Sequence, residues 1–318
     1  MKDFLGIDTS NYTTSASIFS KRTNNIYQYN KKIKVLEGNL GLRQSDAVFE
    51  HVKALPDIIS ILMSKYAPQL QAVGVSVSPR DAENSYMPCF LVGKSIADAV
   101  AATHNISCHY FSHQAGHIMA ALYSSGQTNL LNKDFIAFHI SGGTTEMLLV
   151  KPSKEKIMNI SIISKTLDVS AGQIIDRVGK MMQLSFPAGI ELEALALRSN
   201  ASFISNNKAY SSLKGADCNL SGLENKCRQY LDAKMNKFDV ARFCLDSISE
   251  TIINMIKAYG SFNLPIVFSG GVMANSIIKN NIINYFNKQD IYFASPEYST
   301  DNAVGIAILA SIKERMTK

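Results

Sequence analysis

Cysteine is scarce in this chain of 318 residues. An odd count and the lack of any CxxC pair argue against a disulfide framework and against a cysteine zinc site. We expect buried free thiols instead, at Cys89, Cys108, Cys218, Cys227 and Cys244. No apolar run approaches the roughly 18 residues that span a bilayer, and no secretory signal precedes the first strand pattern. The sequence therefore predicts a cytoplasmic protein without a membrane partner.

Segments of biased composition are also missing. There is no low-complexity stretch, and no Pro/Gly/Ser linker marks independent domains. Hydrophobic residues make up 46% and charged residues 18%, which is ordinary for a globular protein long enough for one large domain or two lobes. The net charge of +6 permits a polyanion such as nucleic acid as a partner but does not require one, because the basic residues are spread out.

Short apolar strands joined by turns of small polar residues occur twice. The first unit covers 4–19 and turns at Asn11 and Tyr12, and the second covers 135–150 and turns at 141–145. A further glycine turn ends the strand at 266–271. Glycines let backbone N–H groups approach an anion, and hydroxyls add donors. Two such units predict two related lobes that face a nucleotide, although one alone would be an unremarkable hairpin.

Helical patterns fill the intervals between these strands. Apolar residues recur near helical period in the first of them, and strands that alternate with helices favour an α/β architecture. A polar stretch at 200–220 is expected to be a surface excursion. The expected helices are 45–64, 90–103, 168–184, 240–259 and 301–315.

Two histidines four residues apart, His113 and His117, carry the clearest chemical signal. On a helix this spacing puts both imidazoles on one face, where each could give one nitrogen to a divalent metal such as zinc or iron. A third ligand would have to come from elsewhere, and Asp301 opens the last predicted helix. A pair of surface or capping histidines explains this loose pattern equally well.

Taken in order, the motifs resemble the TsaD family, the tRNA threonylcarbamoyladenosine synthases once labelled glycoproteases. Each motif is weak by itself, but eight of them in the right order are specific, and they extend from Leu5 to about Ala310. They are LGIDTS at 5–10, HxxxH at 113–117, SGGTT at 141–145, AGQIIDRV at 171–178, FPAG at 186–189, LSGL at 220–223, SGGVMAN at 269–275 and TDNA at 300–303.

This resemblance implies an actin-like ATPase fold: two α/β lobes, each with a mixed five-stranded sheet, and a nucleotide cleft between them. The lobes would be 1–118 and 119–300, with a terminal helix at 301–318 packing back toward the first lobe. The family transfers threonylcarbamoyl from threonylcarbamoyl-AMP to N6 of adenosine 37 in tRNA. It implies tRNA as a partner, and protein partners on the helices of the N-terminal lobe.

The resemblance also assigns ligands. One divalent metal, iron or zinc, would be held by His113, His117 and Asp301. ATP, AMP or an acyl-adenylate would be bound by six residues: a carboxylate for the ribose hydroxyls, glycines against the nucleotide, and an amide for the adenine edge. These six are Ser141, Gly142, Gly143, Asp176, Gly189 and Asn275.

The first hairpin departs from the family pattern, I-E-T-S-C-D-E-T. Asp8 keeps an acid on the strand, and Asp8 and Thr13 occupy the positions expected to be catalytic, but the acidic pair has become Tyr12 and Thr13. A carboxylate there could serve as a base, which threonine cannot do. Thr144 also replaces the histidine of S-G-G-H-T. These changes indicate a divergent paralogue.

Three functions are therefore weighed. The first is the family reaction, and a variant of it is transfer of a carbamoyl-type group to another acceptor, for which the polar loop at 78–88 offers side chains. The second is a non-catalytic nucleotide-binding partner, which the retained metal ligands disfavour. The third is proteolysis, which is disfavoured because HxxxH lacks the glutamate of HExxH that activates water.

Overall fold

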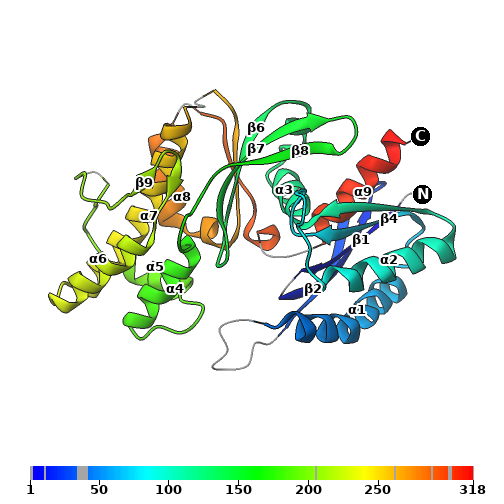
Figure 1. Cartoon of the computed structure of the whole chain (residues 1–318), viewed down its shortest axis with the longest axis horizontal. Helices are drawn as coiled ribbons and strands as arrows, with labels where there is room; N and C mark the ends of the chain where they lie inside the picture. Colours follow the sequence, from blue (N-terminus) through cyan, green and yellow to red (C-terminus); the bar gives the residue numbers. More distant parts are fainter. Residues whose placement is uncertain are drawn as a thin grey trace. The chain divides into compact units, whose positions relative to one another are not determined.

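The computed structural model describes residues 3–10, 12–33, 42–204, 206–260, 263–287, 289–299 and 303–317. The chain divides into two compact units (Figure 1). The first unit consists of Met1–Leu131, Pro152–Ile160 and Thr300–Lys318, and the second of Asn132–Lys151 and Ser161–Ser299.

A mixed five-stranded sheet forms the centre of the first unit, in the order β3-β2-β1-β4-β5. Strand β1 pairs antiparallel with β2 and parallel with β4. The strands are β1 (Asp3–Ser10), β2 (Thr13–Ser20), β3 (Asn25–Lys32), β4 (Leu70–Ser78) and β5 (Ser107–Ser112). The helical elements are α1 (Gln44–Tyr66), α2 (Phe90–His104), α3 (His113–Ser124), η1 (Thr128–Asn132) and α9 (Val304–Met316).

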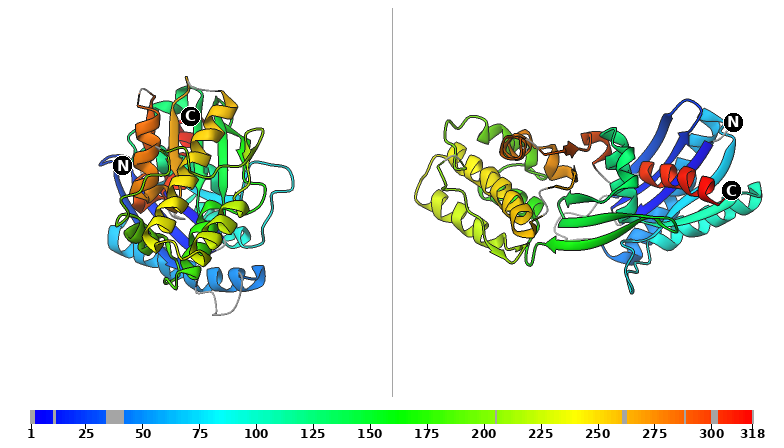
Figure 2. Two further views of the ribbon diagram at one scale, coloured as in Figure 1. Left: turned by 90° about the vertical axis from the view of Figure 1, so that its left-hand side faces the viewer. Right: turned by 90° about the horizontal axis from the view of Figure 1, so that it is seen from above.

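Alternation along β1 and β4 divides this sheet into two faces. Leu5, Ile7 and Val75 turn toward the core shared with α1 and α2. On the other face a Cβ at Gly6 would lie 2.5 Å from the carbonyl oxygen of Ala303, at the start of α9. Because glycine alone leaves room for this approach, α9 packs directly on the strands (Figure 2).

A second sheet has the same topology, in the order β12-β11-β6-β7-β8, and belongs to the second unit except for the end of β7 and the start of β8 within Pro152–Ile160. Strand β6 pairs antiparallel with β7 and parallel with β11, as β1 does with β2 and β4. The strands are β6 (Phe135–Ile140), β7 (Thr145–Ser153), β8 (Ile157–Lys165), β11 (Ile266–Ser269) and β12 (Ile291–Phe293). The other elements are α4 (Ala171–Met181), α5 (Gly189–Ala196), β9 (Leu213–Lys214), β10 (Asp217–Cys218), α6 (Ser221–Asp232), α7 (Lys237–Tyr259), η2 (Gly271–Ala274), α8 (Ser276–Tyr285) and η3 (Pro296–Tyr298).

Aromatic stacking organises the core of the second unit. The rings of Phe138 on β6 and Phe268 on β11 stack with centroids 5.0 Å apart, and Phe293 on β12 continues the stack at 4.9 Å. Helix α7 supplies Phe243 and Ile252 to the same buried cluster. This face of the sheet is therefore closed by helices.

Some predicted boundaries differ from the structure. Helix α4 begins at Ala171 rather than at 168 because Ser170 and Gln173 form a capping box, and it stops before Gln183, whose φ of 63° is left-handed. The last helix begins at Val304, and Asp301 lies outside the described residues. The predicted excursion at 200–220 carries the short strands β9 and β10.

The five cysteines are free thiols, as predicted. Among the helices of the described residues, none has both the length and the apolar character needed to cross a membrane.

Candidate functional site

The two histidines lie on the first turns of α3 in the first unit. The Ser112 side chain caps this helix by accepting a hydrogen bond from the Ala115 amide at 3.2 Å, so the helix begins at His113. His113 Nε2 and His117 Nε2 are 2.9 Å apart. The spacing in the sequence thus predicted their juxtaposition correctly.

Asp8, at the end of β1, determines how His113 is oriented. Its carboxylate is fully buried and lies 3.0 Å from His113 Nδ1. Because a carboxylate can only accept, Nδ1 carries a hydrogen, and Nε2 is the ring nitrogen that faces His117. Ser10 Oγ donates to the other carboxylate oxygen at 2.6 Å, and Ser76 Oγ also donates to Asp8. Burial raises the pKa of Asp8, but the charge and hydrogen bond of His113, with the two hydroxyls, outweigh it and hold this pKa below its usual value.

This arrangement fits a metal ion. Metal-binding histidines commonly donate their other ring N–H to a carboxylate, as His113 does to Asp8. Two nitrogens bound to one ion at about 2.0–2.1 Å are separated by about 3 Å, close to the observed 2.9 Å. No group of three metal-binding side chains occurs among the described residues, and Asp301, the expected third ligand, is outside them.

The start of α9 is fixed against the histidine-bearing helix. A Cβ on Gly305 would lie 1.9 Å from the carbonyl oxygen of Gly116, which precedes His117. Two glycines thus let α3 and α9 cross at backbone contact. The contact brings the first turn of α9 next to Gly116, the residue before His117.

Beside Asp8, the first hairpin turns its hydroxyls inward. Thr13 is 4% exposed and pairs with Ser10, while Tyr12 is 40% exposed. Thr14 Oγ1 lies 2.7 Å from Nδ1 of His51, which burial holds at a pKa of about 4 despite the nearby charge of Asp8. The expected catalytic position Thr13 is therefore a buried hydroxyl without a carboxylate at the turn.

The glycine turn of the second unit is built in the opposite way. The Ser141 amide donates to the Thr144 carbonyl at 2.8 Å, and Ser141 Oγ accepts from the Gly143 and Thr144 amides at 3.3 and 3.2 Å. A Cβ on Gly142 or Gly143 would meet nothing within 4 Å. Interior packing does not require glycine here, so the open backbone is available to a ligand.

The first turn of helix α4 packs against this glycine turn. A Cβ on Gly172 would lie 2.5 Å from the Ser141 carbonyl oxygen, and the Gly172 amide donates to that oxygen at 3.2 Å. Ser170 Oγ donates to the Gly142 carbonyl at 2.7 Å. The predicted residues Ser141, Gly142 and Gly143 thus form one rigid turn.

The predicted ribose-binding residue Asp176 faces the start of α5. Its Oδ1 accepts from the Ala188 amide at 2.9 Å, immediately before Gly189. Burial raises the pKa of Asp176, and the Ala188 bond offsets only part of this. The structure thus brings Asp176 and Gly189 together, and one carboxylate oxygen remains for a ligand hydroxyl.

Asn275, the predicted adenine contact, caps helix α8. Its Oδ1 accepts from the Ile278 amide at 3.1 Å, which leaves the side-chain NH2 as the group for a base. Glu193 on α5, which the sequence did not single out, accepts from the Ser276 amide at 2.7 Å. The residues are 83 positions apart, so no local pattern could reveal this link.

Comparison with known proteins agrees with the motif order. The family model for TsaD, tRNA N6-adenosine threonylcarbamoyltransferase, matches residues 26–308. The chain belongs to the TsaD family. A tRNA N6-adenosine threonylcarbamoyltransferase of Chlorobium chlorochromatii (strain CaD3) is 29% identical over 330 residues, which cover 97% of this chain and 92% of that protein.

Solved structures confirm the predicted actin-like α/β fold of this TsaD family member. Component A of (R)-2-hydroxyglutaryl-CoA dehydratase from Acidaminococcus fermentans matches with a TM-score of 0.59 and 14% identity, over 99% of this chain and all of that one. A ROK hexokinase from Thermus thermophilus matches with a TM-score of 0.51 and 11% identity, over 98% and 99% of the two chains. At these identities the likeness concerns the fold alone.

Proposed function

We propose that the chain transfers threonylcarbamoyl from threonylcarbamoyl-AMP to N6 of adenosine 37 in tRNA, in the cytoplasm. The observation that carries the proposal is the open turn at Gly142 and Gly143, which packs on Gly172 of α4, one helical turn before the half-buried carboxylate of Asp176. Exposed backbone amides suit a phosphate, and a carboxylate suits the ribose hydroxyls. Together these groups would bind the AMP half of the substrate.

In this reaction the chain's own residues bind and orient. The Gly142 amide would hold the phosphate together with the Ser141 hydroxyl, which accepts from the Gly143 amide and can donate its own hydrogen, and both would stabilise charge that develops on the departing AMP. Asp176 and Gly189 would fix the ribose, and Asn275 would donate its side-chain N–H to the base. None of these groups needs to change its protonation state during the transfer.

A divalent metal, iron or zinc, completes the proposal. His113 and His117 would hold it through the two facing Nε2 atoms, and Asp8 would fix the ring of His113. Asp301 is the proposed third ligand, on the strength of the family motif TDNA at 300–303. When bound, such an ion polarises a carbonyl or anchors a carboxylate.

A second candidate keeps the adenylate but changes the acceptor. The first hairpin presents an exposed Tyr12 and a buried Thr13 where family members carry acids. Because neither is a base at neutral pH, a carbamoyl-type transfer to an acceptor other than adenosine 37 is the alternative.

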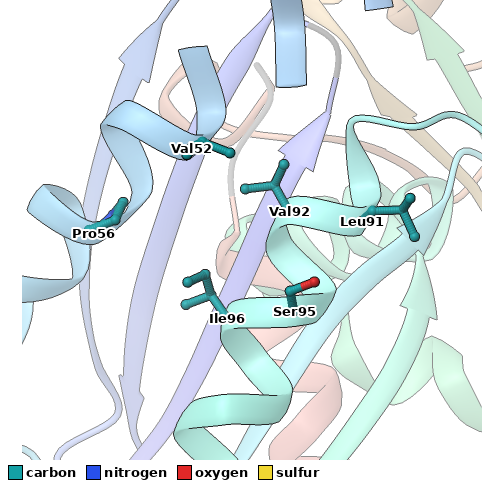
Figure 3. Close-up of a pocket in the computed structure, with 6 residues that line it drawn as sticks. All are labelled: Val52, Pro56, Leu91, Val92, Ser95 and Ile96. Atoms are coloured by element: carbon teal, nitrogen blue, oxygen red, sulfur yellow. The ribbon is translucent and has the colours of Figure 1, made fainter. Parts of the chain in front are cut away.

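We further propose a protein partner on the helices of the first unit. An apolar groove of about 300 Å³ lies between α1 and α2 (Figure 3). Val52 is 54% and Leu91 50% exposed, and Phe49 nearby is 61% exposed. Exposed apolar surface of this kind marks interaction sites. Its lining residues are Val52, Pro56, Leu91, Val92, Ser95 and Ile96.

The deciding experiment is mass spectrometry of the products after metal-loaded protein is incubated with threonylcarbamoyl-adenylate and unmodified tRNA. Modified adenosine would establish the family reaction in this chain. AMP released without modified tRNA would favour the other acceptor. No reaction, in protein that contains metal and binds AMP, would contradict both candidates and leave a non-catalytic nucleotide-binding partner.

Nucleotide placement is tested separately with Asp176→Ala. We expect AMP binding to weaken by about 1–3 kcal/mol, since ribose hydroxyls would lose their acceptor. Asp217→Ala serves as the control, because that carboxylate accepts a backbone bond from Lys165 elsewhere in the same unit. Equal AMP affinities for Asp176→Ala and the unaltered protein, measured by calorimetry, would refute this placement.

A further inference from the structure

Apolar side chains are exposed along helix α5 and in the turn that precedes it. Phe186 and Ile190 are both 85% exposed, Leu197 is 62% exposed, and Ala194 is exposed as well. Residues at i, i+4 and i+7 share one face of a helix. Ile190, Ala194 and Leu197 therefore form one row, and Phe186 precedes it in the turn. We call these four residues the α5 strip.

The backbone on both sides of Phe186 is held in place. The Ser185 amide donates to Glu191 Oε2 at 3.4 Å, and the Ala188 amide donates to Asp176 Oδ1 at 2.9 Å. The ring of Phe186 nevertheless remains in solvent and adds nothing to the core. Exposed apolar surface on an anchored backbone is typical of a binding site.

The α5 strip borders the face of α5 that belongs to the proposed nucleotide site. Gly189 and Glu193 share that face, and Glu193 accepts from the Ser276 amide at 2.7 Å, beside Asn275. Ile190 follows Gly189 by one position, which is about 100° around the helix. A second ligand that approaches a bound adenylate from this side would therefore meet the strip.

The chemistry of the strip suits a nucleobase. Unpaired bases of RNA loops stack on aromatic side chains, and this stacking tolerates any base. Cations adjoin both ends of the strip: Arg198 follows Leu197, and Lys180 on the last turn of α4 follows Gly179. A Cβ on Gly179 would lie 2.2 Å from that of Ala188, so the turn packs closely on this part of α4. Exposed cations beside an aromatic ring favour a ligand that carries phosphates.

We propose that the α5 strip binds an unpaired base of the tRNA loop that carries the acceptor adenosine, and that the ring of Phe186 is the stacking surface. This inference rests on the proposed function and names a further contact of the same site with its RNA substrate. Phe186 takes no part in bond making. It orients the RNA so that the acceptor reaches the adenylate.

The test measures the binding of unmodified tRNA and of AMP separately, in metal-loaded protein. For Phe186→Ala we expect tRNA affinity to fall about tenfold, within the usual range for one stacked base. AMP affinity should change by less than about twofold, since AMP has its own contacts. Phe186→Tyr keeps a ring and should bind tRNA fully, whereas Phe186→Leu is apolar without a ring and should lose affinity as Phe186→Ala does.

A matched control and an altered RNA sharpen this test. Tyr285→Ala removes another exposed aromatic ring of the second unit, 47% exposed at the end of α8, and should bind tRNA as the unaltered protein does. In an anticodon stem-loop RNA, the loop bases are replaced one at a time by abasic nucleotides. One replacement should weaken binding to the unaltered protein about tenfold and have no further effect on Phe186→Ala. Melting temperatures report whether each variant is folded.

The outcomes separate this inference from the proposed function. If the unaltered protein modifies tRNA and Phe186→Ala binds tRNA fully, the stacking role is refuted and the transferase function stands. Weaker AMP binding by Phe186→Ala would place the base of the adenylate itself on the ring and refute the RNA contact. Full tRNA affinity in Phe186→Leu would refute stacking. If the unaltered protein binds no tRNA, transfer to tRNA fails, and this inference with it.

Discussion

The first and second hairpins occupy equivalent places in two sheets of the same topology, yet their polar groups are used in opposite ways. In the first hairpin the side chains of Asp8, Ser10 and Thr13 are buried. In the second, Gly142 and Gly143 leave the backbone open to solvent. The first hairpin thus uses a buried carboxylate, Asp8, to orient His113, whereas the turn of the second hairpin exposes backbone to a ligand.

The equivalence extends to individual contacts. On β1, Asp8 is bonded to Ser76 of the parallel neighbour β4. On β6, His139 is bonded to Ser269 of the parallel neighbour β11. An aspartate in one unit and a histidine in the other are therefore each bonded to a serine of the parallel neighbouring strand. The duplicated fold supplies two places beside a turn where a proton-binding side chain can be fixed.

The largest expected difference between the two units is the loss of unfolding free energy when Asp8 or His139 is replaced by alanine. Asp8→Ala leaves His113 and two buried hydroxyls without their acceptor, and we expect a loss of about 3–5 kcal/mol in unfolding free energy. His139→Ala removes a ring that is only half-buried and bonded to Ser269, and it should cost less, about 1–2 kcal/mol. Calorimetric unfolding of both variants measures this, and equal losses would contradict the contrast drawn between the hairpins.

A milder change isolates the orienting role of Asp8. Asp8→Asn keeps the shape of the side chain but removes the charge that fixes the Nδ1–H tautomer of His113. We expect metal affinity to fall about 10–100-fold, the usual effect of losing a carboxylate behind a metal-binding histidine. Competition with a chelator measures the affinity, and Asp98→Asn on the surface of α2 is the control. Unchanged affinity would show that Asp8 only fills space.

Two glycines at the second hairpin have different roles: Gly172 of α4 packs against the turn, and Gly143 lies in the turn itself. Gly172→Ala places a methyl group against the Ser141 carbonyl and should destabilise the second unit by about 1–3 kcal/mol. Gly143→Ala has space around its methyl group, so stability should change by less than about 0.5 kcal/mol. Its AMP affinity should nevertheless fall about tenfold, or 1.4 kcal/mol. Full AMP affinity in Gly143→Ala would remove the turn from the nucleotide site.

Local patterns in the sequence account for what was predicted well. Apolar segments that end in small residues predicted the strands, and apolar residues at helical period predicted the helices. The HxxxH spacing predicted that the two imidazoles face each other. Contacts between distant residues were not predictable in this way. Asp8 and His113 are 105 positions apart, and their contact depends on which strand lies beside α3.

The neighbours of His139 in the second sheet illustrate the same limit. His139, Glu146 and Ser269 come from three strands, and their neighbourhood depends on strand register rather than on spacing along the chain. The sequence presents them as isolated polar residues in apolar strands. Register is determined by the whole buried face, so it becomes visible only when the sheet is assembled.

The smallest expected effect is a dependence of the unfolding free energy of the second unit on pH, caused by Asp168. This carboxylate accepts hydrogen bonds from the Leu220 and Ser221 amides at 2.8 and 3.0 Å and so tethers the start of α6. Burial raises its pKa, but these hydrogen bonds outweigh it and hold the value at about 2. Because the folded pKa lies below the ordinary one, the stabilisation is complete above about pH 5 and is lost as the pH falls toward 2.

Asp168→Asn should therefore cost about 1 kcal/mol at neutral pH, after allowance for solvent screening, and almost nothing near pH 2. Unfolding free energies across this range measure the difference, and a penalty that stays constant with pH would show that the charge of Asp168 does not hold α6.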